Sequence, residues 1–192
     1  MTNLSTPKVI IDTNSISNFF KYYYFCENKY KKEESKLFVD LCNFFVNEIN
    51  NDNIIVIDKV HDEIKNNWGY KDFIYPKIKN KIFKTEYLFL SEITELSKNV
   101  IEKNKKIQSP EVIEAEINKF ESKYADLYLI AYSMKNEGTI LITDETSNEN
   151  HNKNLFPKIP NLCKEYNVKW GNISYLLFNI YGSRLKFSLK ID

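Results

Sequence analysis

Residues 8–14 read KVIIDTN, and this short stretch decides the fold class. Its β-branched apolar run ends at Asp12 and is too short for a helix, so we expect a fully buried strand here. Turn-forming residues follow at once, and Ile16, Phe19 and Phe20 then recur at helical spacing. A buried strand, a polar turn and a helix in immediate succession are typical of an α/β protein.

Three further apolar runs read as short strands, and helical patterns of apolar residues separate them. Strands that alternate with helices favour a parallel sheet, because the chain must cross over between parallel strands. The order therefore predicts an α/β fold of three layers, α/β/α, with a central parallel sheet of four to five strands. The expected strands cover 54–57, 139–143 and 168–170, and the main expected helices cover 35–49, 125–135 and 173–181.

The length of 192 residues indicates one domain, at roughly 150 residues per domain. We expect residues 1–182 to form it, with a lysine-rich helical insert at about 70–110. Residues 183–192 form the tail, and the alternation of apolar and polar side chains over 185–191 predicts an edge strand of this domain or of a partner. A disordered tail is the alternative.

Composition excludes several classes of protein. The 27 basic and 26 acidic residues leave a net charge of +1, so any binding of nucleic acid must rely on local patches. The chain has four glycines and none of the Gly-rich phosphate motifs of P-loop or Rossmann proteins. It also lacks GxSxG, HxxxH and CxxC motifs, which leaves a covalent nucleophile or a zinc cluster unsupported. No long apolar segment or signal peptide occurs, so we expect a cytoplasmic protein that does not contact membranes.

Acidic and amide side chains follow each of the first three expected strands. Asp12 and Asn14 come after the first strand, and Glu63 lies in the helical pattern after the second. Asp144 and Glu145 close the third strand. Because the carboxyl ends of parallel strands meet at one edge of a sheet, where ligands bind, we expect these side chains to converge.

Asp126 begins the helical pattern of residues 125–135 and joins these acids if that helix starts at the same edge. Several unpaired carboxylates in one place repel each other and raise one another's pKa. Mg²⁺ or Mn²⁺ relieves this repulsion, because a hard divalent cation prefers oxygen ligands. A metal site of this kind lowers the pKa of a bound water and promotes its attack on a phosphodiester.

Each of these residues also has a purely structural interpretation, and for Asp144 or Glu145 it is that of a turn residue. Asp126 is a candidate N-cap of its own helix, and Asn14 is a candidate N-cap of the first helix that also bonds Asp12. Glu63 is alternatively a solvated helix acid, and Asp12 alternatively forms an Asx turn. A carboxylate directly after a buried strand nevertheless lowers the stability of the fold unless another group pairs with its charge.

Four short motifs occur in an order that resembles a known family. The motif VIIDTNSI occupies 9–16, VHDEI occupies 60–64, ADLYLIAYSMK occupies 125–135 and ILITDE occupies 140–145. They resemble the four acidic motifs of PIN domains, the metal-dependent ribonucleases typified by the VapC toxins of toxin–antitoxin pairs. The stretch KIPNLCKEYNVKW at 158–170 is similar to the end of one PIN-like branch, and the middle segment is longer than in the compact toxins.

The resemblance implies a PIN-like α/β/α domain with a metal site. Asp12, Glu63 and Asp126 match the first three acids of the family, and Asn14 matches the polar partner of the first. At the fourth position the family shows a threonine, any residue, and then an acid or amide.

In the family's register Thr143 is the hydroxyl and Glu145 is the fourth acid, whereas Asp144 lies one residue earlier and competes with Glu145. We expect only one of these two acids to be a direct metal ligand. Thr143 and Asn14 are then expected to orient the ligands and the attacking water.

The expected function is a Mg²⁺- or Mn²⁺-dependent endoribonuclease, and by resemblance the toxin of a type II toxin–antitoxin pair. RNA is the expected substrate, held by the lysines of residues 64–86, and a cognate antitoxin and a second copy of the chain are candidate protein partners. The alternative is a catalytically weak PIN-like module that binds RNA or protein. A receiver domain is a third interpretation, but it needs a lysine at a late strand end, where residues 139–143 end in threonine and acids follow.

Overall fold

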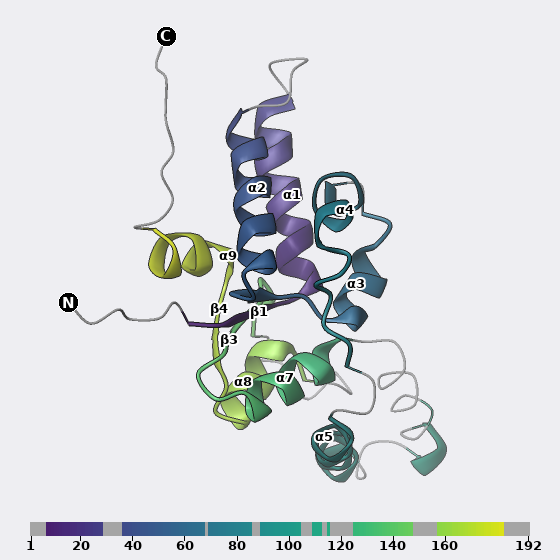
Figure 1. Ribbon diagram of the computed structural model, residues 1–192. Helices are drawn as coiled ribbons and strands as arrows, with labels where there is room; N and C mark the ends of the chain where they lie inside the picture. The colour runs from purple at the N-terminus through teal and green to yellow at the C-terminus, as the bar shows by residue number, and fades with distance from the viewer. Residues whose placement is uncertain are drawn as a thin grey trace, which may run out of the picture.

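The computed structural model shows an α/β/α arrangement around one parallel sheet, which confirms the expected fold class (Figure 1). The tail expected to form an edge strand, residues 183–192, lies outside the described part of the chain. The structure describes residues 7–28, 36–67, 69–85, 89–104, 109–112, 115, 125–147 and 157–182.

The sheet has four strands in the order β2-β1-β3-β4, and all neighbouring pairs are parallel. The strand expected over 54–57 is shorter in the ladder, because Ile57 instead forms a separate parallel bridge with Phe83. The strands are β1 (Val9–Ile11), β2 (Ile54–Ile55), β3 (Ile140–Ile142) and β4 (Lys169–Gly171).

Helices lie on both faces of this sheet, with α1, α2 and α9 on one side and α7 and α8 on the other (Figure 1). Among the helices of the described ranges, none has the length and apolar character that crossing a membrane requires. The helices are α1 (Thr13–Asn28), α2 (Lys36–Asn50), α3 (Asp58–Ile64), η1 (Tyr70–Ile74), α4 (Tyr75–Ile78), α5 (Leu90–Asn104), α7 (Asp126–Lys135), α8 (Ile159–Glu165), α9 (Ile173–Tyr175) and η3 (Leu176–Ile180).

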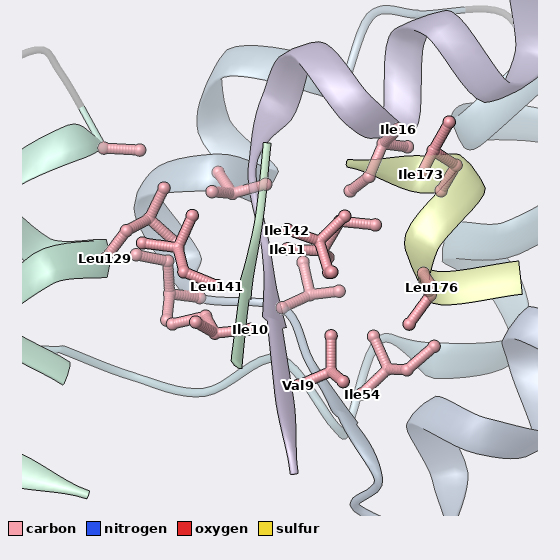
Figure 2. Close-up of a cluster of buried hydrophobic side chains, with 14 of the residues drawn as sticks. Val9, Ile10, Ile11, Ile16, Ile54, Leu129, Leu141, Ile142, Ile173 and Leu176 are labelled. Atoms are coloured by element: carbon pink, nitrogen blue, oxygen red, sulfur yellow. The ribbon is translucent and has the colours of Figure 1, made fainter. Parts of the chain in front are cut away.

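The central strands are buried on both faces, which explains why β1 reads as an unbroken apolar run. Ile10 and Leu141 point toward Leu129 of α7, whereas Ile11 points to the opposite side, toward Ile173 of α9 (Figure 2). All of these side chains are at most 7% exposed. Each such side chain contributes roughly 1.5–3 kcal/mol when it is withdrawn from water, so the two layers of helices hold the sheet from both sides.

The chain reverses its direction of travel across the sheet between β1 and β3. From β1 it continues outward to β2, whereas from β3 it continues outward to β4 on the other side. In open parallel sheets, ligands bind beyond the carboxyl ends of the strands at such a reversal point. The fold therefore places a candidate site where β1 ends at Asp12 and β3 ends at Thr143.

Candidate functional site

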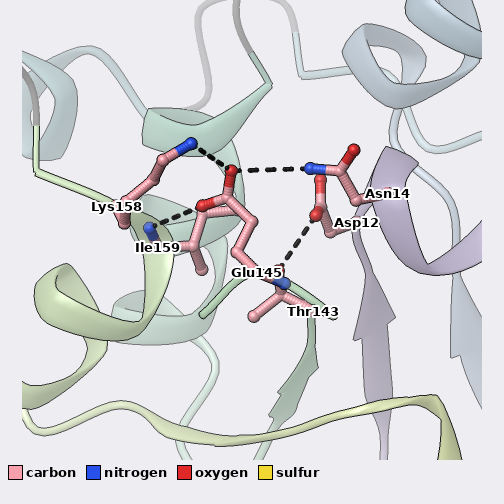
Figure 3. Close-up of polar contacts among 6 residues, drawn as sticks. All are labelled: Asp12, Asn14, Thr143, Glu145, Lys158 and Ile159. Atoms are coloured by element: carbon pink, nitrogen blue, oxygen red, sulfur yellow. Dashed lines mark hydrogen bonds and ion pairs between the residues drawn. The ribbon is translucent and has the colours of Figure 1, made fainter. Parts of the chain in front are cut away.

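Asp12 and Thr143 join the ends of β1 and β3. The Thr143 Oγ1 hydroxyl donates a hydrogen bond to Asp12 Oδ2 at 3.0 Å, and both side chains are almost completely buried (Figure 3). Thr143 Oγ1 also accepts a hydrogen bond from the backbone N–H of Glu145 at 3.2 Å. Thr143 thus orients both Asp12 and the backbone that carries Glu145.

Glu145 lies beside Asp12 and is held by three nitrogen donors (Figure 3). Its Oε1 accepts from Lys158 Nζ at 2.9 Å and from Asn14 Nδ2 at 3.5 Å, and its Oε2 accepts from the Ile159 N–H at 3.1 Å. Asn14 was expected to bond Asp12 or to cap the first helix. In the structure it lies within the first turn of α1, and its amide contacts Glu145 instead.

Asp144 serves a different part of the molecule from Glu145. Its Oδ2 accepts from Asn18 Nδ2 of α1 at 3.2 Å, and its Oδ1 accepts from the backbone N–H of Ile173, the first residue of α9, at 2.9 Å. Successive side chains of an extended chain point to opposite sides, which separates the two acids. Glu145, and not Asp144, therefore lies with Asp12.

Glu63 comes from the last turn of α3 and links that helix to two others. Its Oε2 accepts a hydrogen bond from the Thr13 hydroxyl of α1, and its Oε1 accepts from the Ala125 N–H at 2.9 Å. Ala125 directly precedes α7. Although Glu63 is exposed, it is not simply a solvated helix acid, because both of its oxygens have partners within the protein.

Asp126 is the first residue of α7 and does not act as its N-cap. The N-cap position is Ala125, and no side chain caps this helix. Within the described ranges no residue donates a hydrogen bond to the Asp126 carboxylate, which is nevertheless only partly exposed. The structural interpretation of Asp126 as a capping residue is therefore wrong.

Burial and mutual repulsion raise the pKa of two of these acids. The pKa of Asp12 rises to about 7, chiefly through burial and also through Glu145 and Glu63, although the Thr143 hydrogen bond opposes the rise. The pKa of Asp126 rises to about 8, chiefly through burial and then through the charge on Asp12. Both acids are thus partly protonated near neutral pH, and a bound cation would favour their ionised forms.

The site lies within the range of a described protein family. Residues 10–179 match the family model described as "Domain of unknown function (DUF4411)". The chain belongs to this family. No curated protein and no solved structure matches the chain. The matched range includes every residue of the site: Asp12, Asn14, Glu63, Asp126, Thr143, Asp144 and Glu145.

The acidic cluster, meaning Asp12, Glu63, Asp126 and Glu145, offers only oxygen donors, which suits Mg²⁺ or Mn²⁺. As the side chains stand, no three His, Cys, Asp or Glu residues of the described ranges are grouped so as to hold a metal ion. Glu63 and Glu145 instead accept hydrogen bonds from O–H and N–H donors. The donor chemistry fits the ion, and each oxygen of these two carboxylates that accepts a single hydrogen bond keeps a second lone pair for it.

Two residues of this site were not expected from the sequence. Thr13 stands inside the DTN motif, whose pattern identified only its neighbours on either side. Lys158 directly precedes α8, and a proline in the first turn marks that helix start in the sequence. Nothing in the sequence, however, shows that a lysine 13 residues after Glu145 returns to contact it.

Proposed function

We propose that this chain is a Mg²⁺- or Mn²⁺-dependent endoribonuclease that hydrolyses RNA phosphodiester bonds. The observation that carries the proposal is the acidic cluster at the reversal point of the sheet. Burial and like charge raise the pKa of Asp12 to about 7 and that of Asp126 to about 8. Such perturbed carboxylates at the carboxyl ends of parallel strands mark candidate functional sites.

The four residues of the acidic cluster would hold the ion. When bound, the ion supplies a water of lowered pKa and neutralises charge on the phosphodiester oxygens. The chain itself keeps the carboxylates in place: Thr143 fixes Asp12, and Asn14 contacts Glu145. Loss of such supporting contacts typically costs 10- to 100-fold in metal affinity or activity, as a rough guide.

The lysines of residues 64–86 are proposed to hold the RNA backbone. All six are exposed, and two of them already pair with acids, Lys65 with Asp62 and Lys81 with Asp52. Lysine contacts to phosphates release counterions, so RNA binding should weaken as salt is raised. The six side chains are Lys65, Lys71, Lys77, Lys79, Lys81 and Lys84.

The deciding test is an RNA cleavage assay on the purified chain with Mn²⁺ and with EDTA. Cleavage should require the metal, and Asp12→Asn should abolish it while the circular dichroism spectrum stays intact and the melting temperature does not fall. Asp62→Asn is the matched control, because Asp62 lies next to Glu63 on α3 but pairs with Lys65 at the surface. Full cleavage by Asp12→Asn, or full cleavage in EDTA, contradicts the proposal.

A cytoplasmic toxin restrained by a cognate antitoxin is the proposed biological role, by resemblance to the VapC toxins. An antitoxin of this kind would cover the acidic cluster. Expression of the chain alone should then arrest growth, and the Asp12→Asn variant should not. Normal growth with abundant wild-type protein contradicts the toxin role. It does not contradict nuclease activity, which the cleavage assay tests.

The second candidate is a PIN-like module that binds RNA or protein without turnover. It is favoured by the present side-chain arrangement, in which no three acids of the described ranges group around a metal position and Lys158 holds Glu145. Calorimetric titration with Mn²⁺ separates the two candidates. RNA binding without Mn²⁺ binding at millimolar concentration supports the second.

A further inference from the structure

Lys158 brings a positive charge to the acidic cluster. Its ammonium lies 2.9 Å from Glu145 Oε1, and its charge also acts on Asp126 and Asp12. Its charge opposes the rise in the pKa of Asp126 that burial and then the surrounding carboxylates cause. The lysine therefore supplies part of the compensation that the proposed metal ion would also supply.

The contacts of Glu145 imply that Lys158 and a metal ion compete for the same oxygen, Oε1. Glu145 Oε1 accepts from both Lys158 Nζ and Asn14 Nδ2, whereas Oε2 accepts only from the Ile159 N–H, so it is Oε1 that has no free lone pair (Figure 3). The Glu145 side chain is only 11% exposed, which leaves little room for an additional partner. An ion that binds Oε1 replaces one of its two donors, and the ammonium is the one whose positive charge repels a cation.

Lys158 is free to leave, whereas its backbone stays in place. Its side chain is 42% exposed, so the displaced ammonium can enter water. Its backbone, by contrast, is anchored at the start of α8, where the next residue bonds Glu145 and Pro160 stands in the first turn. The exchange needs a rotation of one flexible side chain and no movement of the fold.

We infer that Lys158 is a positioning residue that competes with the metal ion for Glu145. It holds the carboxylate in the ion-free protein and is displaced from Oε1 when the ion binds. The inference rests on the proposed metal-dependent function and names a residue that sets the metal affinity of the site.

The test is calorimetric titration of the full chain with Mn²⁺ alone. Lys158→Met should bind Mn²⁺ about three- to fivefold more tightly than the wild type, as expected when a partly exposed ion pair no longer opposes binding. Lys158→Arg keeps the charge and should bind like the wild type. Lys164→Met, an exposed lysine of the same helix, is the matched control and should also bind like the wild type.

The Glu145→Gln background identifies the partner through which Lys158 acts. In that background Lys158→Met should no longer tighten binding, because the neutral amide no longer pairs with the ammonium or attracts the ion. Equal or weaker Mn²⁺ binding by Lys158→Met overturns the inference, as does a gain that persists without Glu145 or appears in Lys164→Met. A wild type that binds Mn²⁺ but cleaves no RNA contradicts the proposed function alone, and absence of Mn²⁺ binding in every variant overturns both.

Discussion

Asp12 and Asp58 each follow a buried strand or bridge residue, and each accepts a threonine hydroxyl, yet the charges around them differ. Asp58 Oδ1 accepts from the Lys59 N–H at 2.9 Å and from Thr85 Oγ1 at 2.6 Å, and its Oδ2 accepts from the Thr85 N–H at 3.2 Å. Asp12 accepts from Thr143, but it faces the charges of Glu63 and Glu145 and has a raised pKa.

The contrast shows that an acid at a strand end is not by itself evidence of a functional site. Hydrogen-bond donors fully occupy the Asp58 carboxylate, so it ties the segment around Thr85 to the start of α3. Asp12 lies among like charges, and the hydrogen bonds that it accepts do not offset their effect on its pKa. The uncompensated negative charge around Asp12, and not its position in the sheet, distinguishes the candidate site.

The largest expected difference is between two consecutive residues, Glu145 and Asp144. Glu145→Gln should lower kcat/KM for RNA cleavage about a thousandfold, or roughly 4 kcal/mol, because a proposed ligand is lost. Asp144→Ala should leave kcat/KM within about fivefold and lower the free energy of unfolding by about 1–2 kcal/mol, because two hydrogen bonds to α1 and α9 are lost. Cleavage kinetics and urea unfolding measure the two effects, and equal losses of activity would erase the distinction.

The second prediction concerns the pH dependence of stability that the raised pKa of Asp12 causes. Its pKa is raised from 3.8 to about 7, so the folded state keeps a proton that the unfolded state releases. Stability should therefore fall as pH rises through this window, by up to about 1.4 kcal/mol per unit of raised pKa. Asp126, whose pKa is about 8, extends the fall to higher pH.

Urea unfolding at about pH 5 and about pH 8, without metal, measures this fall. Asp12→Asn should flatten the profile and stabilise the protein at the higher pH, because the substituted side chain carries no charge. A wild-type profile that is flat or rises over the window would show that Asp12 is not strained.

The third prediction concerns the hydrogen-bonded side of the comparison. Asp58→Ala should lower the free energy of unfolding by about 1–3 kcal/mol, because the buried Thr85 loses both of its side-chain acceptor contacts. RNA cleavage should stay near the wild-type rate when measured well below the melting temperature. A variant with unchanged stability and lost cleavage would place Asp58 in the site and remove the contrast.

The smallest effect on stability is expected for an ion pair that is exposed to solvent. Lys81 pairs with Asp52 at 3.1 Å, and their side chains are 38% and 61% exposed. Lys81→Met should change the free energy of unfolding by less than about 0.5 kcal/mol, because exposed ion pairs are screened by water. Thermal unfolding measures this change. A loss as large as that of Asp58→Ala would mean that the contribution of these carboxylates to stability does not depend on their exposure.

Local patterns in the sequence were sufficient for the fold class and for the candidate acids. The run that ends at Asp12 predicted a buried strand, and the structure has β1 over Val9–Ile11. The alternation of strands and helices predicted the parallel sheet, because parallel strands require crossovers. The same alternation predicted Glu63, Asp144 and Glu145 at the carboxyl edge, and Asp126 with them if its helix began there.

Apolar periodicity is a property of neighbouring positions, so the sequence was enough to predict where the main strands and helices lie. Packing between elements is what turns Glu145 toward Asp12 and Asp144 toward α1 and α9, and what brings Asn14 to Glu145. The same packing brings Lys158 to the acidic cluster. Side-chain direction at a strand end and the return of a distant segment depend on packing between elements, and no local pattern encodes them.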